Sequence, residues 1–135
     1  MGVTRVNPEV LAPPIQGLYS QIVVSQGSRR VYIAGQVAID ASGSLVGLGD
    51  HESQARQAWS NIKGAVHAVG GTGHDIVRYS IAVVDHRPEL VEIIYRVGIE
   101  IFGDEFPKAA SILTGVQTLA FPEWLVEIEA EAILD

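Results

Sequence analysis

The sequence predicts an α+β domain in which one β-sheet carries two helices on the same face. Its 135 residues, 47% hydrophobic and 19% charged, suffice for one domain with a packed core and are too apolar for a disordered chain. Two stretches, 51–71 and 88–102, repeat apolar residues at the three- and four-residue spacing of a helix. Alternating segments stand before, between and after them. The predicted order is therefore ββ-α-β-α-ββ, in a single domain over residues 1–135.

The first alternating segment runs from Tyr19 to Ile39 and is interrupted at Gln26-Gly27-Ser28. Alternation on both sides of a turn predicts a β-hairpin. Residues 1–16 contain three prolines and predict an irregular lead-in. A hairpin does not require the polar residues Tyr19-Ser20-Gln21 at its entrance, so this group is a first indication of a binding site.

Each predicted helix has its own boundary signals. Asp50 is a candidate N-cap for the first helix, Gly70-Gly71 would end it, and Pro88 suits the first position of the second. The predicted buried faces are Ala55, Ala58, Ile62, Ala65, Val66 and Val69 in the first helix, and Leu90, Val91, Ile94, Val97, Gly98 and Ile101 in the second.

Three further strands are predicted over residues 75–85, 110–117 and 124–134. The last one alternates most regularly. Its apolar face is Trp124, Val126, Ile128, Ala130, Ala132 and Leu134, and its other face carries Glu127, Glu129 and Glu131. These glutamates either meet solvent or, since helices on one side leave the other face of the sheet bare, line a contact with another subunit.

Composition argues against several classes of protein. The net charge of −7 and the lack of a basic cluster disfavour a nucleic-acid partner. The chain has no cysteine, and its four histidines lack the spacing of metal ligands, so we expect no metal and no other cofactor. No apolar stretch approaches the roughly 20 residues that span a bilayer, so we expect no membrane partner and a cytoplasmic location.

The chain as a whole resembles the Rid family, also called YjgF/YER057c/UK114, the reactive-intermediate (imine) deaminases. The similar segments are "APPIQGLYSQIVVSQGSRRVYIAGQVAID", "QARQAWSNIKGAVHAVGGTGHDIVRYSIAVVD" and "FPKAASILTGVQTLAFPEWLVEIEAEAI", in family order. The resemblance implies a chorismate-mutase-like fold and a homotrimer with small-molecule pockets at its subunit interfaces. In the family's chemistry, water attacks the carbon of a C=N bond, and ammonia leaves.

The same resemblance assigns the candidate site. Glu127 corresponds to the family's pocket glutamate and becomes the candidate catalytic residue. The corresponding substrate-binding positions are Tyr19, Ala34, Gly35, Glu92, Ala110 and Ser111. Ala34 replaces a serine and Glu92 an asparagine of well-studied deaminases.

The family's signature arginine, which holds the carboxylate of 2-imino acids, falls on Ala110 or Ser111 here. The resemblance therefore implies an imine or enamine hydrolase with a substrate other than small 2-imino acids. The alternatives are a trimer that binds a small molecule without catalysis and, disfavoured by the acidic composition, an endoribonuclease or translation inhibitor.

Overall fold

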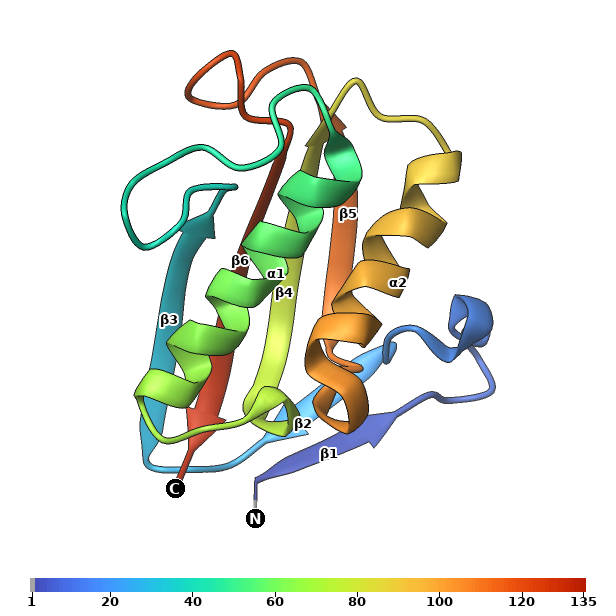
Figure 1. Ribbon diagram of the computed structural model, residues 1–135. Helices are drawn as coiled ribbons and strands as arrows, with labels where there is room; N and C mark the ends of the chain where they lie inside the picture. The colour runs from blue at the N-terminus through green and yellow to red at the C-terminus, as the bar shows by residue number, and fades with distance from the viewer. Residues whose placement is uncertain (1) are drawn as a thin grey trace.

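A computed structural model of the chain, described over residues 2–135, contains a four-stranded sheet with two helices on one face (Figure 1). The sheet has the order β3-β6-β4-β5, and a separate two-stranded sheet pairs β1 with β2. The strands are β1 (Val3–Val6), β2 (Ile22–Ser25), β3 (Arg29–Gln36), β4 (Ile76–Val84), β5 (Ala110–Val116) and β6 (Val126–Leu134). The helices are α1 (His51–Ala68) and α2 (Glu89–Phe102), with short 3-10 turns η1 (Ile15–Gly17), η2 (Gly73–Asp75) and η3 (Gly103–Glu105). The predicted α+β class is confirmed.

The sheet is mixed. Strands β3 and β4 both pair antiparallel with β6, whereas β4 and β5 are parallel. Parallel neighbours need a crossover, and α2 supplies it between β4 and β5. β6 returns last and is inserted between β3 and β4, so it is buried at the centre of the sheet.

The predicted hairpin over residues 19–39 is wrong. β2 pairs with β1, inside the lead-in that we expected to be irregular, while β3 pairs with β6. Gly27 lies against the end of β6, where an added Cβ would stand 2.5 Å from the Ile133 side chain and 2.7 Å from the Leu134 carbonyl oxygen. The turn therefore carries the chain past β6 from one sheet to the other. Alternation predicted strands on both sides of the turn but not their partners.

The helices begin where the sequence predicts. The side chain of Asp50 accepts a hydrogen bond from the Glu52 amide, which caps α1, and Pro88 immediately precedes α2. The predicted burial of Val69 is wrong, since it follows the last turn of α1 and is 42% exposed. The prediction also omitted the largest core side chain, Trp59, whose indole donates to the Ile94 carbonyl at 3.0 Å.

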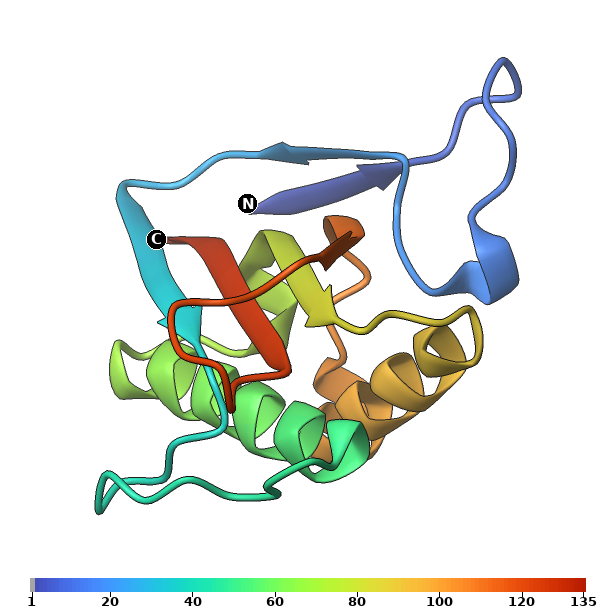
Figure 2. The same cartoon turned by 90° about the horizontal axis from the view of Figure 1, so that it is seen from above.

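The other face of the sheet carries no helix (Figure 2). The β1–β2 ribbon crosses behind the sheet only near one end, as Figures 1 and 2 show together. On β6 the alternation is confirmed: Val126, Ile128, Ala130, Ala132 and Leu134 are buried, whereas Glu129 and Glu131 are exposed on this outer face. Trp124, predicted for the same apolar face, precedes the strand and is only partly buried. Glu127, Ser80 and Ala82 are only partly buried.

Candidate functional site

Glu127 and Gly35 are in direct contact. They lie on the neighbouring strands β6 and β3, at an irregularity where the pairing shifts between Ile33–Ala130 and Gln36–Ile128. A Cβ added to Gly35 would stand 1.9 Å from Oε2 of Glu127 and 2.8 Å from its Cδ. Only glycine therefore lets the carboxylate rest against the β3 backbone. The exposed Ala34 precedes this contact in β3.

A shallow hollow of about 150 Å³ lies in front of the Glu127 side chain, on the outer face of the sheet. It is lined by Ser80, Ile81, Ala82, Thr114, Glu127 and Glu129. Glu127 is directly opposite Ala82, which is in turn opposite Thr114 on β5. Within residues 2–135, no ion pair or side-chain hydrogen bond occupies the Glu127 carboxylate. An acid in this position is available to a ligand or a water molecule.

A second group of candidate residues surrounds a pocket of about 280 Å³, here called the Tyr19 pocket, which is lined from η1, α2 and β5. Figure 1 shows the arrangement of α2 and β5. Tyr19, Tyr95 and Ser111 contribute hydroxyl groups, and the Tyr95 and Ser111 oxygens are 3.3 Å apart. The apolar lining is Ile15, Leu18, Val91, Ile112 and Leu113. The pocket is thus apolar with one polar region.

Ser20 holds Tyr19 at this pocket. Its amide donates to the Ala109 carbonyl at 3.2 Å, its hydroxyl donates to the Lys108 carbonyl, and the residue is only 3% exposed. The neighbouring Gln21 side chain donates to the Ala12 carbonyl at 2.7 Å. Two members of the polar group that the sequence singled out are therefore supports, because they fix the segment that presents Tyr19 beside β5.

Ala110 and Ser111 lie on opposite faces of β5. Ser111 is in the Tyr19 pocket, whereas Ala110 pairs with the exposed Arg78 of β4 on the other face. Glu92 is exposed on α2 and lines an adjoining depression of about 270 Å³ together with Arg96.

The structure therefore divides the predicted site into two groups. Gly35 and Glu127 are in contact at the junction of β3 and β6, with Ala34 next to Gly35 in β3. Tyr19, Glu92 and Ser111 lie around the space between η1, α2 and the edge strand β5, and Ala110 lies apart from both groups, beside Arg78. Within one chain, the hollow of Glu127 and the Tyr19 pocket share no lining residue.

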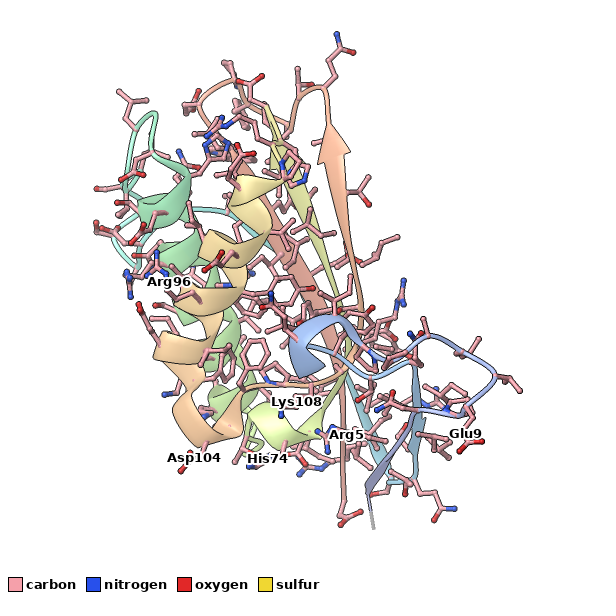
Figure 3. The ribbon with its side chains drawn as sticks, turned by 90° about the vertical axis from the view of Figure 1, so that its right-hand side faces the viewer. Arg5, Glu9, His74, Arg96, Asp104 and Lys108 are labelled. Carbon is pink, nitrogen blue, oxygen red and sulfur yellow. The ribbon has the colours of Figure 1, made fainter. Side chains whose placement is uncertain are left out.

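No basic side chain of residues 2–135 lines either cavity. Arg78 faces Glu131 across the outer sheet face, and Arg96 forms ion pairs of 3.1 Å with both Glu52 and Glu100. Lys108 and Asp104, both labelled in Figure 3, line an adjoining depression of about 380 Å³ that shares only Leu18 with the Tyr19 pocket. The same residues contain no cluster of three or more histidine, aspartate or glutamate side chains suited to a metal ion.

The sequence and the fold were compared with known proteins. The profile of the endoribonuclease L-PSP family matches residues 10–134. The chain belongs to this family. Rid proteins are members of it, and the crystal structure of YyfB from Yersinia pestis, a Rid protein of unknown function, superposes with a TM-score of 0.90. It is 38% identical, and the match covers 99% of this chain and 100% of that one.

Other Rid relatives have named activities. The 2-iminobutanoate/2-iminopropanoate deaminases of Capra hircus and Homo sapiens are 34% and 31% identical, each over 97% of this chain and 90% of the relative. The structure of TdcF from E. coli with bound serine is 26% identical, with a TM-score of 0.67 over 96% of this chain and 94% of that one. No helix among residues 2–135 has the length and apolar character to cross a membrane.

Proposed function

We propose that this Rid protein hydrolyses an imine or enamine other than a small 2-imino acid, with Glu127 as the catalytic acid–base. One observation carries the proposal: the Glu127 carboxylate lies against the backbone of Gly35, without an ion-pair partner, at the rim of an outer-face hollow. The names of the deaminase relatives supply the reaction type.

The reaction needs one group that moves protons at the C=N carbon. Water adds to that carbon while Glu127 takes one of the water protons and passes a proton to the nitrogen, which gives a neutral carbinolamine. Glu127 then takes the hydroxyl proton and passes a proton to the amino nitrogen; the C–N bond breaks, ammonia departs, a carbonyl product remains and the Glu127 carboxylate is regenerated. A carboxylate that already faces the reacting water avoids most of the entropic cost of positioning it.

We further propose that the working site forms between subunits of a homotrimer. The Glu127 hollow and the Tyr19 pocket are separate in one chain, and the sheet face that holds Glu127 is not covered by a helix. Placing β5 of one subunit beside that face of the next would bring Tyr19 and Ser111 toward Glu127. Sedimentation should give a trimer, and a stable monomer at micromolar concentration would refute this assembly.

The residues at 110 and 111 bear on the substrate. A charge-assisted hydrogen bond to a carboxylate contributes about 1.5–3 kcal/mol. Its loss lowers the affinity for a 2-imino acid by roughly one to two powers of ten. Neither Ala110 nor Ser111 can form such a contact. The neighbouring basic residues do not line the pocket: Lys108 lines an adjoining depression, and Arg96 is paired with Glu52. Turnover of 2-aminoacrylate as efficient as that of arginine-containing relatives would overturn this part of the proposal.

The test is ammonia release from a panel of imines, generated in situ by oxidising the corresponding amines and amino acids. The Glu127→Gln variant keeps the size of the side chain but cannot take up a proton, so we expect turnover to fall at least about a hundredfold. The matched control is Glu131→Gln, on the same face of β6 and exposed, which should remain within a few-fold of wild type. Wild-type turnover by Glu127→Gln would overturn the proposal. A trimer that binds the imines but releases no ammonia would establish the non-catalytic alternative.

A further inference from the structure

Two of the hydroxyl groups that line the Tyr19 pocket, those of Tyr95 and Ser111, lie next to a third, buried tyrosine. Tyr79 on β4 pairs directly with Ser111 on β5, and its ring centroid is 6.4 Å from that of Tyr95. The Tyr95 and Ser111 oxygens are 3.3 Å apart. Tyr79 is only 1% exposed, and among the described residues its hydroxyl has no hydrogen-bond partner.

A buried hydroxyl without a partner costs about 1–3 kcal/mol. Ser111 can remove this cost, because a serine hydroxyl can accept one hydrogen bond while donating another. If a ligand accepts the Ser111 proton, the serine oxygen is left oriented to accept from Tyr79. Burial, with a smaller contribution from Tyr95, raises the pKa of Tyr79 well above its ordinary value, which keeps this phenol a donor.

The surroundings of the hydroxyl cluster do not suit an anion. None of the eight described residues that line the pocket is charged. One adjoining depression is lined by Glu92 and by Arg96, whose charge is compensated by Glu52 and Glu100. The other is lined by Lys108 and Asp104, which carry opposite charges. A carboxylate entering this pocket would lose hydration without gaining a counter-charge, whereas a neutral carbonyl oxygen would lose little.

We propose that the substrate is an uncharged imine with an apolar body and a neutral hydrogen-bond acceptor, such as an amide or ketone oxygen, received by Ser111 and Tyr95. This inference rests on the proposed function, because it concerns the same site. Hydroxyl donors would thus select a neutral acceptor at the position where the signature arginine of the family would bind a carboxylate.

The test uses two unreactive probes of the same shape, phenylacetamide and phenylacetate, titrated into the wild-type protein at pH 7 and followed by NMR. We expect the amide to bind at least about tenfold more tightly, with shifts centred on Tyr95 and Ser111. Equal or tighter binding of phenylacetate, shifts confined to another surface, or no binding of the amide at millimolar concentration would each overturn the inference.

Two variants sharpen the result. Ser111→Ala should lower the affinity for the amide several-fold and leave that for phenylacetate unchanged, while Ser60→Ala on α1 should alter neither. Ser111→Arg should reverse the preference by at least about tenfold toward phenylacetate, because it adds a charge-assisted contact. Should Ser111→Arg fail to fold, Ser111→Ala still decides, since unchanged amide binding there would remove Ser111 from recognition.

The probes do not react, so this test is independent of turnover. A protein that prefers the amide but hydrolyses no imine would keep the selection of a neutral acceptor by this pocket and overturn the proposed function. A protein that hydrolyses imines but prefers phenylacetate would do the reverse.

Discussion

Replacing Gly35 by alanine tests the contact that defines the site. The new Cβ would lie 1.9 Å from Oε2 of Glu127, whereas ordinary contacts begin at 3.4 Å, so the carboxylate must retreat by about 1.5 Å. Gly35 does not have a left-handed φ, and alanine can adopt its backbone conformation. The clash falls on the far end of a flexible side chain, so we expect the free energy of unfolding to change by less than about 1 kcal/mol.

The catalytic effect should be much larger. Misplacing a reacting group by about 1 Å can cost a hundredfold in rate, so Gly35→Ala should lose at least that factor in ammonia release from the best imine of the panel. Gly64→Ala is the matched control: it lies in α1 with open space around it, and alanine should stabilise the helix by up to about 1 kcal/mol without affecting turnover. A Gly35→Ala protein with wild-type turnover would refute the reasoning.

Two further predictions concern stability. Gly98→Ala places a Cβ 2.7 Å from the buried ring of Trp59, which cannot move aside, so urea unfolding should show a loss of about 1–3 kcal/mol; no loss would contradict the packing. Burial raises the pKa of Tyr79 above its ordinary 10.0. The stability that the neutral phenol contributes is therefore complete below about pH 10. It is lost as the pH rises further, because Tyr79 ionises in the unfolded chain before it ionises in the folded one. Tyr79→Phe should therefore lessen the alkaline loss of stability, unlike Tyr32→Phe at a 69% exposed position, and identical pH profiles for both variants would contradict the assignment.

Local sequence signals predicted most elements because each is decided by neighbouring residues. The cap at Asp50, the apolar repeat of both helices and the alternation of β6 all appear in the structure. The pairing of β2 with β1 was not predictable in this way, since the β1 sequence Val-Thr-Arg-Val shows no alternation and only tertiary contacts select the partner. Gln54 was also missed: a polar residue on an apolar helix face gives no sign that it will be fully buried, with hydrogen bonds to Gly47, Glu123 and Leu125.

The candidate site was predictable only through the family resemblance. Three glutamates share one face of β6, and alternation alone does not distinguish Glu127 from Glu129 or Glu131. The structure adds a physical difference, the contact of Glu127 with Gly35. The unpartnered hydroxyl of Tyr79 depends on the register of β4 with β5, which the sequence does not encode locally.

The most direct test of a site shared between subunits is complementation between two inactive variants. Glu127→Gln inactivates the half of the site on β6, and Tyr19→Ala inactivates the half at the Tyr19 pocket. The two proteins are unfolded together and refolded as mixed trimers. If each site joins Glu127 of one subunit to Tyr19 of the next, random mixing restores both intact halves at about one site in four. The account therefore predicts recovery of about a quarter of wild-type ammonia release. No recovery above the separate variants, from mixed trimers shown to have formed, would contradict it.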